Sequence, residues 1–332
     1  MSEITGVTVL IPFRNEAIHL PTIIDALEKQ IIKENIEIIW IDDASEDDGR
    51  AIVMKAVDRN SQWKCLTREG APGKKFALHT GVSAARYNYI LTTDADSYMD
   101  TTWLQNAHSV IREHPLAEMI ILPVVVQPEN HFLSQLQYAE SLHLLALNTI
   151  MSSLGCPVLC SGANLIFRKS FYTSAYTTRN DFHIASGDDM FLLDKAEKVA
   201  FVASKGLVTT QPTNDWHSFV HQRIRWFGKV RHLKRPRFFA VGVLVGIWQF
   251  ALYLWLLAAW YFGWTWAPCV IFTCAKISID GISQWLIARK LNQRFYMLST
   301  FSYSLLYPIL QLVILFLRIF IQPTWKGRAI DR

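Results

Sequence analysis

The sequence predicts an α/β domain with a mostly parallel β-sheet flanked by helices, followed by a C-terminal transmembrane helical region. Two observations predict this class. In the first half of the chain, short β-rich runs alternate with stretches that carry apolar residues at helical spacing, a pattern typical of parallel strands joined by crossover helices. The segment from Phe238 to Gln322 is overwhelmingly apolar, within a chain of 332 residues that is 51% hydrophobic.

The alternation defines four expected strands and three expected helices. The strands are Val7–Pro12, Ile36–Ile41, Asn88–Thr93 and Met119–Val126. The helices are Leu20–Gln30, Gly49–Arg59 and Phe76–Ala85, each with apolar residues on one face. Ligands of parallel sheets bind beyond the carboxyl ends of the strands. The polar residues that follow each strand are therefore the candidates for the site.

A change in composition near Pro236 divides the chain into residues 1–237, an apolar region 238–322 and a short tail 323–332. The expected spans are about 238–262, 267–288 and 297–321. The first has no charge over 25 residues, which is about 38 Å of helix. The second contains Lys276 and Asp280, which oppose insertion unless they pair within the protein, so we expect two or three spans.

Charge distribution predicts the side of the membrane. Seven Lys and Arg residues lie between Arg223 and Arg237, directly before the first expected span. Such a basic segment marks the cytoplasmic side, and no secretory signal precedes the first strand. We therefore expect an integral membrane protein with residues 1–237 on the cytoplasmic face. The net charge of +5 is too modest to indicate a nucleic-acid partner.

Two acidic groups follow expected strands. Asp94-Ala95-Asp96 comes after the third, and in an extended segment residues i and i+2 point the same way, so both carboxylates can reach one Mg²⁺ or Mn²⁺ ion. Asp42 and Asp43 end the second strand, where clustered carboxylates require a cation or hydrogen-bond donors. A solvated loop and a helix N-cap are the alternative explanations of the two groups.

Two further turns suit an anionic nucleotide. The first strand ends in a polar turn that contains Pro12, Arg14 and Glu16. Gly73 and Lys74 open the third helix, where a positive charge and free N–H groups can meet an anion. An ordinary basic turn at the surface would explain the second pattern equally well.

Two helical motifs complete the candidates. Asp188 and Asp189 precede an apolar run, so one can cap a helix while the other acts as a general base. On a helix, Gln222, Arg225 and Trp226 share one face, and their side chains suit a diphosphate and a sugar ring. An amphipathic helix lying on a membrane is the alternative for this second motif.

Taken in order, these elements resemble a family 2 glycosyltransferase with a GT-A fold, over roughly residues 5–230. The matching motifs are the opening turn, the first acidic pair, a GK element, a DxD, an ED-like pair and a QxxRW motif. The segment Ser161-Gly162-Ala163-Asn164 also resembles an acceptor-side segment of the family. The chain departs at the ED pair, which reads Asp188-Asp189 and leaves the role of Asp188 open.

The resemblance implies an inverting transfer from a nucleoside diphosphate sugar, with a UDP-sugar as the expected donor. Pro12, Arg14, Glu16 and Asp42 would then line the donor site. The resemblance implies that Asp43 contacts the base or ribose of the donor, that Lys74 lies near the nucleotide and that Asp94 contacts the donor. Asp96, together with Asp94, would ligate Mg²⁺ or Mn²⁺, and Gln222 and Arg225 would hold the diphosphate. Asp189 would be the base, and Gly162 and Trp226 would contact the acceptor.

The acceptor is the most open part of this reading. Channel-forming polysaccharide synthases usually carry spans before the catalytic domain as well as after it, whereas here the expected spans all follow it. We therefore expect a lipid or lipid-linked acceptor, with a processive synthase of poly-N-acetylglucosamine or hyaluronan as the alternative. A non-catalytic nucleotide-sugar binding protein, a nucleotidyltransferase and a transporter fit the motifs less well.

Overall fold

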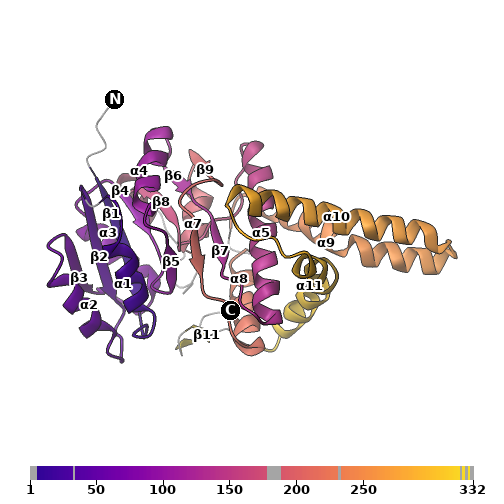
Figure 1. Cartoon of the computed structure of the whole chain (residues 1–332), viewed down its shortest axis with the longest axis horizontal. Helices are drawn as coiled ribbons and strands as arrows, with labels where there is room; N and C mark the ends of the chain where they lie inside the picture. Colours follow the sequence, from indigo (N-terminus) through magenta and orange to yellow (C-terminus); the bar gives the residue numbers. More distant parts are fainter. Residues whose placement is uncertain are drawn as a thin grey trace. The chain divides into compact units, whose positions relative to one another are not determined.

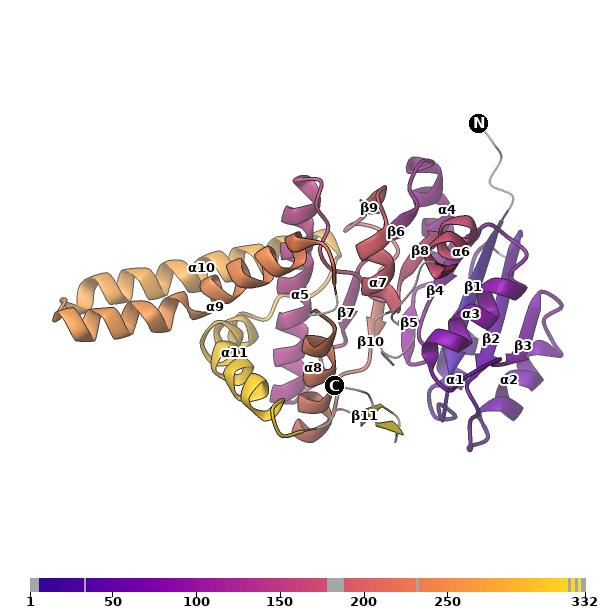
Figure 2. The same cartoon turned by 180° about the vertical axis from the view of Figure 1, so that it is seen from behind.

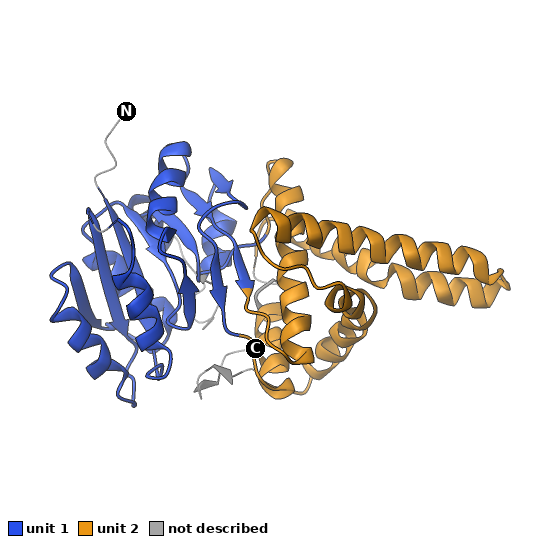
Figure 3. Ribbon diagram, in the orientation of Figure 1, with its two compact units in different colours: residues 1–125, 159–211, 324–332 blue, residues 126–158, 212–323 orange. Residues whose placement is uncertain are grey.

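The structure is a computed structural model that describes residues 6–32, 34–177, 188–230, 233–321, 324–325 and 328–329. The chain forms two compact units (Figure 3). Unit 1 comprises residues 1–125, 159–211 and 324–332, and unit 2 comprises residues 126–158 and 212–323.

Unit 1 is built on a seven-stranded sheet within the described residues, in the order β3-β2-β1-β4-β8-β6-β9 (Figures 1 and 2). The strands are β1 (Val7–Phe13), β2 (Ile36–Asp42), β3 (Trp63–Thr67), β4 (Tyr89–Thr92), β6 (Met119–Ile121), β8 (Leu165–Arg168) and β9 (Val199–Phe201). Strands β3, β2, β1 and β4 are mutually parallel, and β6 is parallel to β9. The prediction of a mostly parallel sheet is thus confirmed, although β8 lies antiparallel between β4 and β6.

The expected strand over residues 119–126 is wrong as a single element. It consists of β6 and β7 (Val124–Val126), which belong to different sheets, because β7 joins β5 (Ser97–Met99) and β10 (Val208–Thr210). The break falls at Leu122 and Pro123. Proline has no N–H to donate to a ladder, so the interruption is expected there once the residue is seen in context.

Successive side chains of a strand point to opposite faces of the sheet, so apolar residues of the main sheet can pack against helices on both faces. The helices of unit 1 are α1 (Leu20–Glu28), α2 (Gly49–Val57), α3 (Lys74–Ala84), α4 (Trp103–Glu113), α6 (Lys169–Thr177) and α7 (Asp188–Lys195). Val9, Ile11 and Trp40 are buried in one core with side chains of α1, α2 and α4. The alternate residues Leu10 and Ile41 face α3.

Unit 2 is helical and contains the three candidate spans found in the described part of the chain. Its helices are α5 (Phe132–Ser153), α8 (Trp216–Val230), α9 (Pro236–Phe262), α10 (Trp266–Lys290) and α11 (Met297–Leu317). The last three are long and apolar enough to cross a membrane. Pro236 begins α9, and Gly263 ends it in the left-handed conformation with φ of 66°, the usual placement of these two residues at helix ends. The two-stranded ribbon β11 (Thr324–Trp325) and β12 (Arg328–Ala329), which follows α11 in the chain, belongs to unit 1.

The charged pair of the second span faces the protein. Lys276 Nζ lies 2.7 Å from Asp280 Oδ2, and the two side chains are 0% and 1% exposed. Asp280 also accepts hydrogen bonds from Trp248 Nε1 at 2.9 Å and from Ser304 Oγ at 2.8 Å. One carboxylate on α10 therefore ties α9 and α11 together, and the pairing that insertion requires is present.

Candidate functional site

The carboxyl ends of β1 and β2 meet at one edge of the main sheet because the two strands are parallel neighbours. Arg14 follows β1 and is buried, with Nη1 donating to the Asp43 carbonyl oxygen at 3.1 Å and Nη2 lying 3.0 Å from Glu46 Oε1. Asp43 N in turn donates to the Phe13 carbonyl at 2.9 Å. Hydrogen bonds therefore connect the polar turn after the first strand to the first acidic pair. The sequence order alone does not predict this contact.

Asp43 connects this edge to the start of α3. Its side chain is 2% exposed, accepts a hydrogen bond from Gly73 N at 3.2 Å and pairs with Arg68. Burial raises the pKa of Asp43, while the Gly73 N–H and the Arg68 and Arg14 guanidinium groups oppose that rise. Asp42 has different partners: its side chain accepts a hydrogen bond from Ser45 N at 2.9 Å and lies 3.6 Å from Arg50 Nη1.

Lys74 is the first residue of α3 and forms an ion pair with Asp94. Gly73 precedes it with φ of 132°, a backbone conformation that residues with a Cβ atom rarely adopt. Asp94 lies just after β4, the neighbour of β1 in the sheet. Both side chains of the pair are 32% exposed, so they remain within reach of a ligand.

Gly162 and Asp189 lie beside this pair. Gly162 N donates to Asp189 Oδ2 at 3.3 Å. A Cβ atom at position 162 would lie 3.5 Å from Lys74 Nζ. Asp189 Oδ1 accepts from Met190 N at 2.9 Å, at the beginning of α7. Asp94, Lys74, Gly162 and Asp189 thus form one contiguous group from four separate parts of unit 1, which we call the Lys74 cluster.

The geometry of the DxD differs from the expectation. Asp94, Ala95 and Asp96 are not extended, because Ser97 N donates to the Asp94 carbonyl at 3.1 Å and closes a four-residue turn. The turn is required because β5 begins at Ser97 and runs in another sheet. Ala95 is buried, whereas Asp94 and Asp96 are half-buried on either side of it.

The donor set at this turn consists of carboxylate oxygens, which are the ligands that Mg²⁺ and Mn²⁺ prefer. Within the part of the chain that the structure describes, no group of three or more His, Cys, Asp or Glu side chains could hold a metal ion. Asp94 and Asp96 offer carboxylate oxygens of this kind, and in this structure the Asp94 carboxylate is paired with Lys74.

The remaining predicted residues of unit 1 lie at or near the ends of elements. Pro12 lies within β1 and is half-buried. The Glu16 carbonyl accepts from His19 N and Leu20 N at 2.9 and 3.0 Å, at the start of α1. Helix α7 begins at Asp188, but the side chain of Asp188 lies outside the described residues.

Asn164 is a residue whose role the sequence reasoning missed. It is fully buried, donates to the carbonyls of Pro123 and Gly206 at 2.9 and 2.7 Å, and accepts from Trp103 Nε1 at 3.1 Å. It therefore anchors the segment that carries Gly162. No pattern in the sequence marks this role, because its three partners are distant in the chain.

The three residues of the Gln-x-x-Arg-Trp motif lie on α8, in unit 2. Trp226 is 39% exposed, and Gln222 and Arg225 are half-buried. Arg223, between them in the sequence, is almost fully buried. Its Nε lies 3.1 and 3.2 Å from the two carboxylate oxygens of Glu140 on α5.

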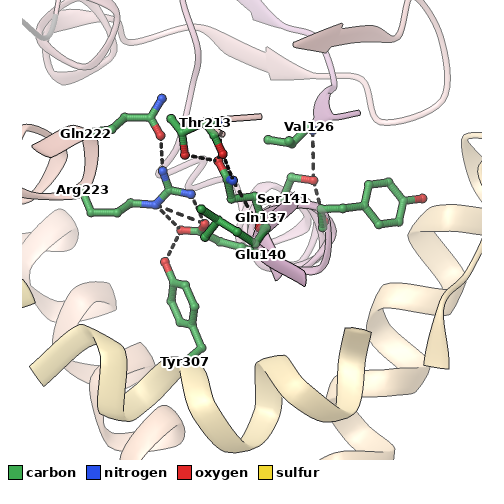
Figure 4. Close-up of polar contacts among 10 residues, drawn as sticks. Val126, Gln137, Glu140, Ser141, Thr213, Gln222, Arg223 and Tyr307 are labelled. Atoms are coloured by element: carbon green, nitrogen blue, oxygen red, sulfur yellow. Dashed lines mark hydrogen bonds and ion pairs between the residues drawn. The ribbon is translucent and has the colours of Figure 1, made fainter. Parts of the chain in front are cut away.

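Arg223 is the centre of a polar network that Figure 4 shows. Arg223 Nη1 donates to Gln222 Oε1, and the Tyr307 hydroxyl on α11 donates to Glu140. The sequence reasoning named neither Arg223 nor Glu140 as a site residue. A signal was present, since Glu140 is the single charged residue in the 22 residues of α5, and a lone charge on an apolar helix needs a partner.

Comparisons with known proteins agree with the motifs. The model of glycosyl transferase family 2 matches residues 8–174. Glycosyltransferase GlyG of Streptococcus pneumoniae is 27% identical over 34% of this chain and 36% of its own length. A poly-β-1,6-N-acetyl-D-glucosamine synthase of Staphylococcus aureus is 25% identical over 51% of this chain and 41% of its own. The chain thus matches about two fifths of the length of these relatives.

A solved structure supports the fold. The mannosyltransferase PcManGT of Pyrobaculum calidifontis, in complex with GDP-Man and Mn²⁺, superposes with a TM-score of 0.57 at 16% identity. The match covers 92% of this chain and 88% of that one.

Proposed function

Because the chain belongs to glycosyl transferase family 2 and has the GT-A fold, we propose that it transfers a sugar from a nucleoside diphosphate sugar to a lipid or lipid-linked acceptor at a membrane. The observation that carries this proposal is the Lys74 cluster. It brings the Lys74 ammonium, the Asp94 carboxylate, Gly162 and the Asp189 carboxylate to one place. We further propose inversion at the anomeric carbon and a UDP-sugar as the donor.

The donor would bind along the carboxyl edge of the sheet. Arg14 and Asp43 would contact the nucleoside, with Pro12, Glu16 and Asp42 around them, and the Lys74 ammonium would face the diphosphate. Support comes from the contacts that join these residues, from Arg14 to Asp43 and from Asp43 to Gly73. The structural neighbour PcManGT was solved with GDP-Man, which is also a nucleoside diphosphate sugar, and with Mn²⁺.

Asp94 and Asp96 would hold Mg²⁺ or Mn²⁺ against the diphosphate. The ion would neutralise the charge that develops on the leaving diphosphate. Gln222 and Arg225 would donate hydrogen bonds to the same group, because an amide and a planar guanidinium suit phosphate oxygens.

Asp189 would take the proton of the acceptor hydroxyl. The hydroxyl oxygen then bonds to the anomeric carbon, the bond from that carbon to the diphosphate breaks, and the electron pair leaves with the nucleoside diphosphate. The N–H groups of Gly162 and Met190 hold the two oxygens of Asp189 in place, as a base that must reach one hydroxyl requires. Gly162 and Trp226 would contact the acceptor, and Asp188 would support the base.

We also propose that residues 1–237 form the cytoplasmic catalytic part, that 238–322 form the membrane region before a short tail, and that two of the helices α9, α10 and α11 cross the membrane. An even number of crossings keeps β11 and β12, which belong to unit 1, on the same side as residues 1–125. The two ends of α9 support its placement in the membrane. Basic residues precede its start, and its far end carries Trp260 and Tyr261, 79% and 75% exposed, followed by Trp266, 77% exposed. Basic residues favour the cytoplasmic interface, and Trp and Tyr favour either interface.

A processive polysaccharide synthase is the second candidate. It is favoured by the similarity to the S. aureus enzyme, whose name states that its product is a poly-β-1,6-N-acetyl-D-glucosamine.

The test uses the full chain in lipid nanodiscs, with a panel of nucleoside diphosphate sugars, Mg²⁺ or Mn²⁺, and a membrane lipid extract. We expect release of a nucleoside diphosphate that depends on lipid, together with a lipid product heavier by one sugar. Chelation of the divalent cation should abolish both. A ladder of product masses would favour the synthase instead. No release with any donor would refute both functions.

A further inference from the structure

We propose that Arg223 is a positioning residue that orients the amide of Gln222, so that the amide presents its NH₂ group to the diphosphate of the donor. The proposal rests on the proposed function, because it assigns a direction to an interaction which that function requires. It adds Glu140 and Tyr307, from α5 and α11, to the residues that determine donor binding.

The chemistry of arginine sets the orientation. A guanidinium group has only hydrogen-bond donors, so the atom of Gln222 that faces Arg223 Nη1 must be the carbonyl oxygen. The NH₂ group is then the part of the amide left for a ligand. A donor group suits a phosphate oxygen, whereas a carbonyl oxygen turned toward it would repel it.

Burial keeps Arg223 in this position. Arg223 is 2% exposed, Glu140 4% and Tyr307 3%. The Glu140 carboxylate accepts hydrogen bonds from Nε and Nη2 of Arg223 and from the Tyr307 hydroxyl. A buried charge that loses a partner is strongly destabilised, so the guanidinium cannot swing toward solvent without leaving Glu140 unpaired.

The same guanidinium contacts a second residue of the motif. Its carbon lies 4.3 Å from the ring centroid of Trp226 and 4.3 Å from that of Phe219. Arg223 therefore fixes both the amide proposed for the diphosphate and the indole proposed for the acceptor, through one planar group. Both contacts come from one planar guanidinium group.

The experiment measures binding of UDP, or of the nucleoside diphosphate that the donor panel identifies, to the full chain in nanodiscs. Tyr307→Phe removes one hydroxyl from the network and keeps the ring, which stacks on Tyr303 at 4.7 Å. We expect the dissociation constant to rise by up to about tenfold, because a hydrogen bond to a charged group contributes a factor of about ten or more and only part of its loss at Glu140 reaches the ligand through Arg223 and Gln222. Tyr253→Phe is the matched control, since its hydroxyl donates to the Leu305 carbonyl within the same unit.

A double-mutant comparison separates positioning from general destabilisation. In a Gln222→Ala background, Tyr307→Phe should have no further effect on the dissociation constant, because the amide it orients is gone. Equal losses in both backgrounds, or no loss in the Gln222-containing protein, would overturn the proposal.

Gln222→Glu gives an independent check that leaves the core intact. A carboxylate would still accept from Arg223 but would present an oxygen to the diphosphate, so binding should be weaker than in Gln222→Ala. Binding as strong as in the unsubstituted protein would refute the donor role of Gln222. If the unsubstituted protein bound no nucleoside diphosphate at all, the proposed function itself would fail.

Discussion

At the scale of single residues, a carboxylate at the start of a helix can cap the helix or act as a general base, and the contacts of Asp189 distinguish the two. Its Oδ1 accepts the N–H of Met190 at 2.9 Å, which is a local contact at the first turn of α7. Its Oδ2 reaches outside the helix to Gly162 N at 3.3 Å. Capping alone would not place this side chain next to the glycine that adjoins Lys74.

Replacement of Asp189 by Asn should remove the base and keep the shape. The amide oxygen can still accept one of the two N–H groups, so we expect nearly unchanged donor binding and a transfer rate lower by about 10²- to 10⁴-fold. Product formation and donor titration on the same sample measure the two effects. Asp194→Asn, on the same helix, is the matched control, and undiminished transfer by Asp189→Asn would remove Asp189 from the base role.

At the scale of elements, α3 positions Lys74 because it packs closely on the sheet. Gly81 allows this approach. A Cβ atom at that position would lie 2.9 Å from Ile41 Cδ1 and 3.1 Å from Leu10 Cδ2, both on the face of the sheet that α3 covers. The glycine near the end of the helix therefore determines where the lysine at its start meets Asp94.

We expect Gly81→Val to push α3 away from the sheet. Overpacking of this kind costs about 1–3 kcal/mol of stability, and the shift should also weaken donor binding because Lys74 moves with the helix. Ser83→Val, on the exposed face of the same helix, places the same side chain where no contact is lost. Similar melting temperatures and donor affinities for the two variants would contradict this account of α3.

At the scale of the whole molecule, unit 2 joins segments that the sequence separates. Helix α5 lies in the first half of the chain, yet it shares a buried core with α8 and α11 through Leu136, Phe219 and Tyr307. The polar contacts of Asp280 then tie α9, α10 and α11 together. Buried charge is therefore part of what holds the helical unit in one arrangement.

Asp280→Ala should be more damaging than loss of the whole ion pair. The single change leaves Lys276 charged and unpaired at a site where the side chain is fully buried, which costs about 3–5 kcal/mol. The double variant Lys276→Met with Asp280→Ala should recover much of that loss. Unfolding of the full chain in detergent measures both, and equal loss in the two variants would mean that the pair contributes through packing alone.

Local pattern was sufficient for several features of this protein. Hydrophobic periodicity predicted β1, β2, β4 and helices α1–α3, because each depends on neighbours within a few residues. The apolar segments of unit 2 were predicted for the same reason, and the motif order was specific enough to identify the family.

Other features were decided by the tertiary structure, because they depend on residues far apart in the chain. The antiparallel insertion of β8, the break of residues 119–126 into two sheets and the turn at Asp94–Ser97 follow from sheet pairing that no local window contains. The contact of Gly162 with Asp189, and the burial of Arg223 against Glu140 and Tyr307, join segments on different elements. The sequence by itself indicated β1, β2, β4, α1–α3, the apolar helices of unit 2 and the polar residues that follow the strands. Only the packing of the elements decided which of those side chains meet, because the partners come from distant parts of the chain.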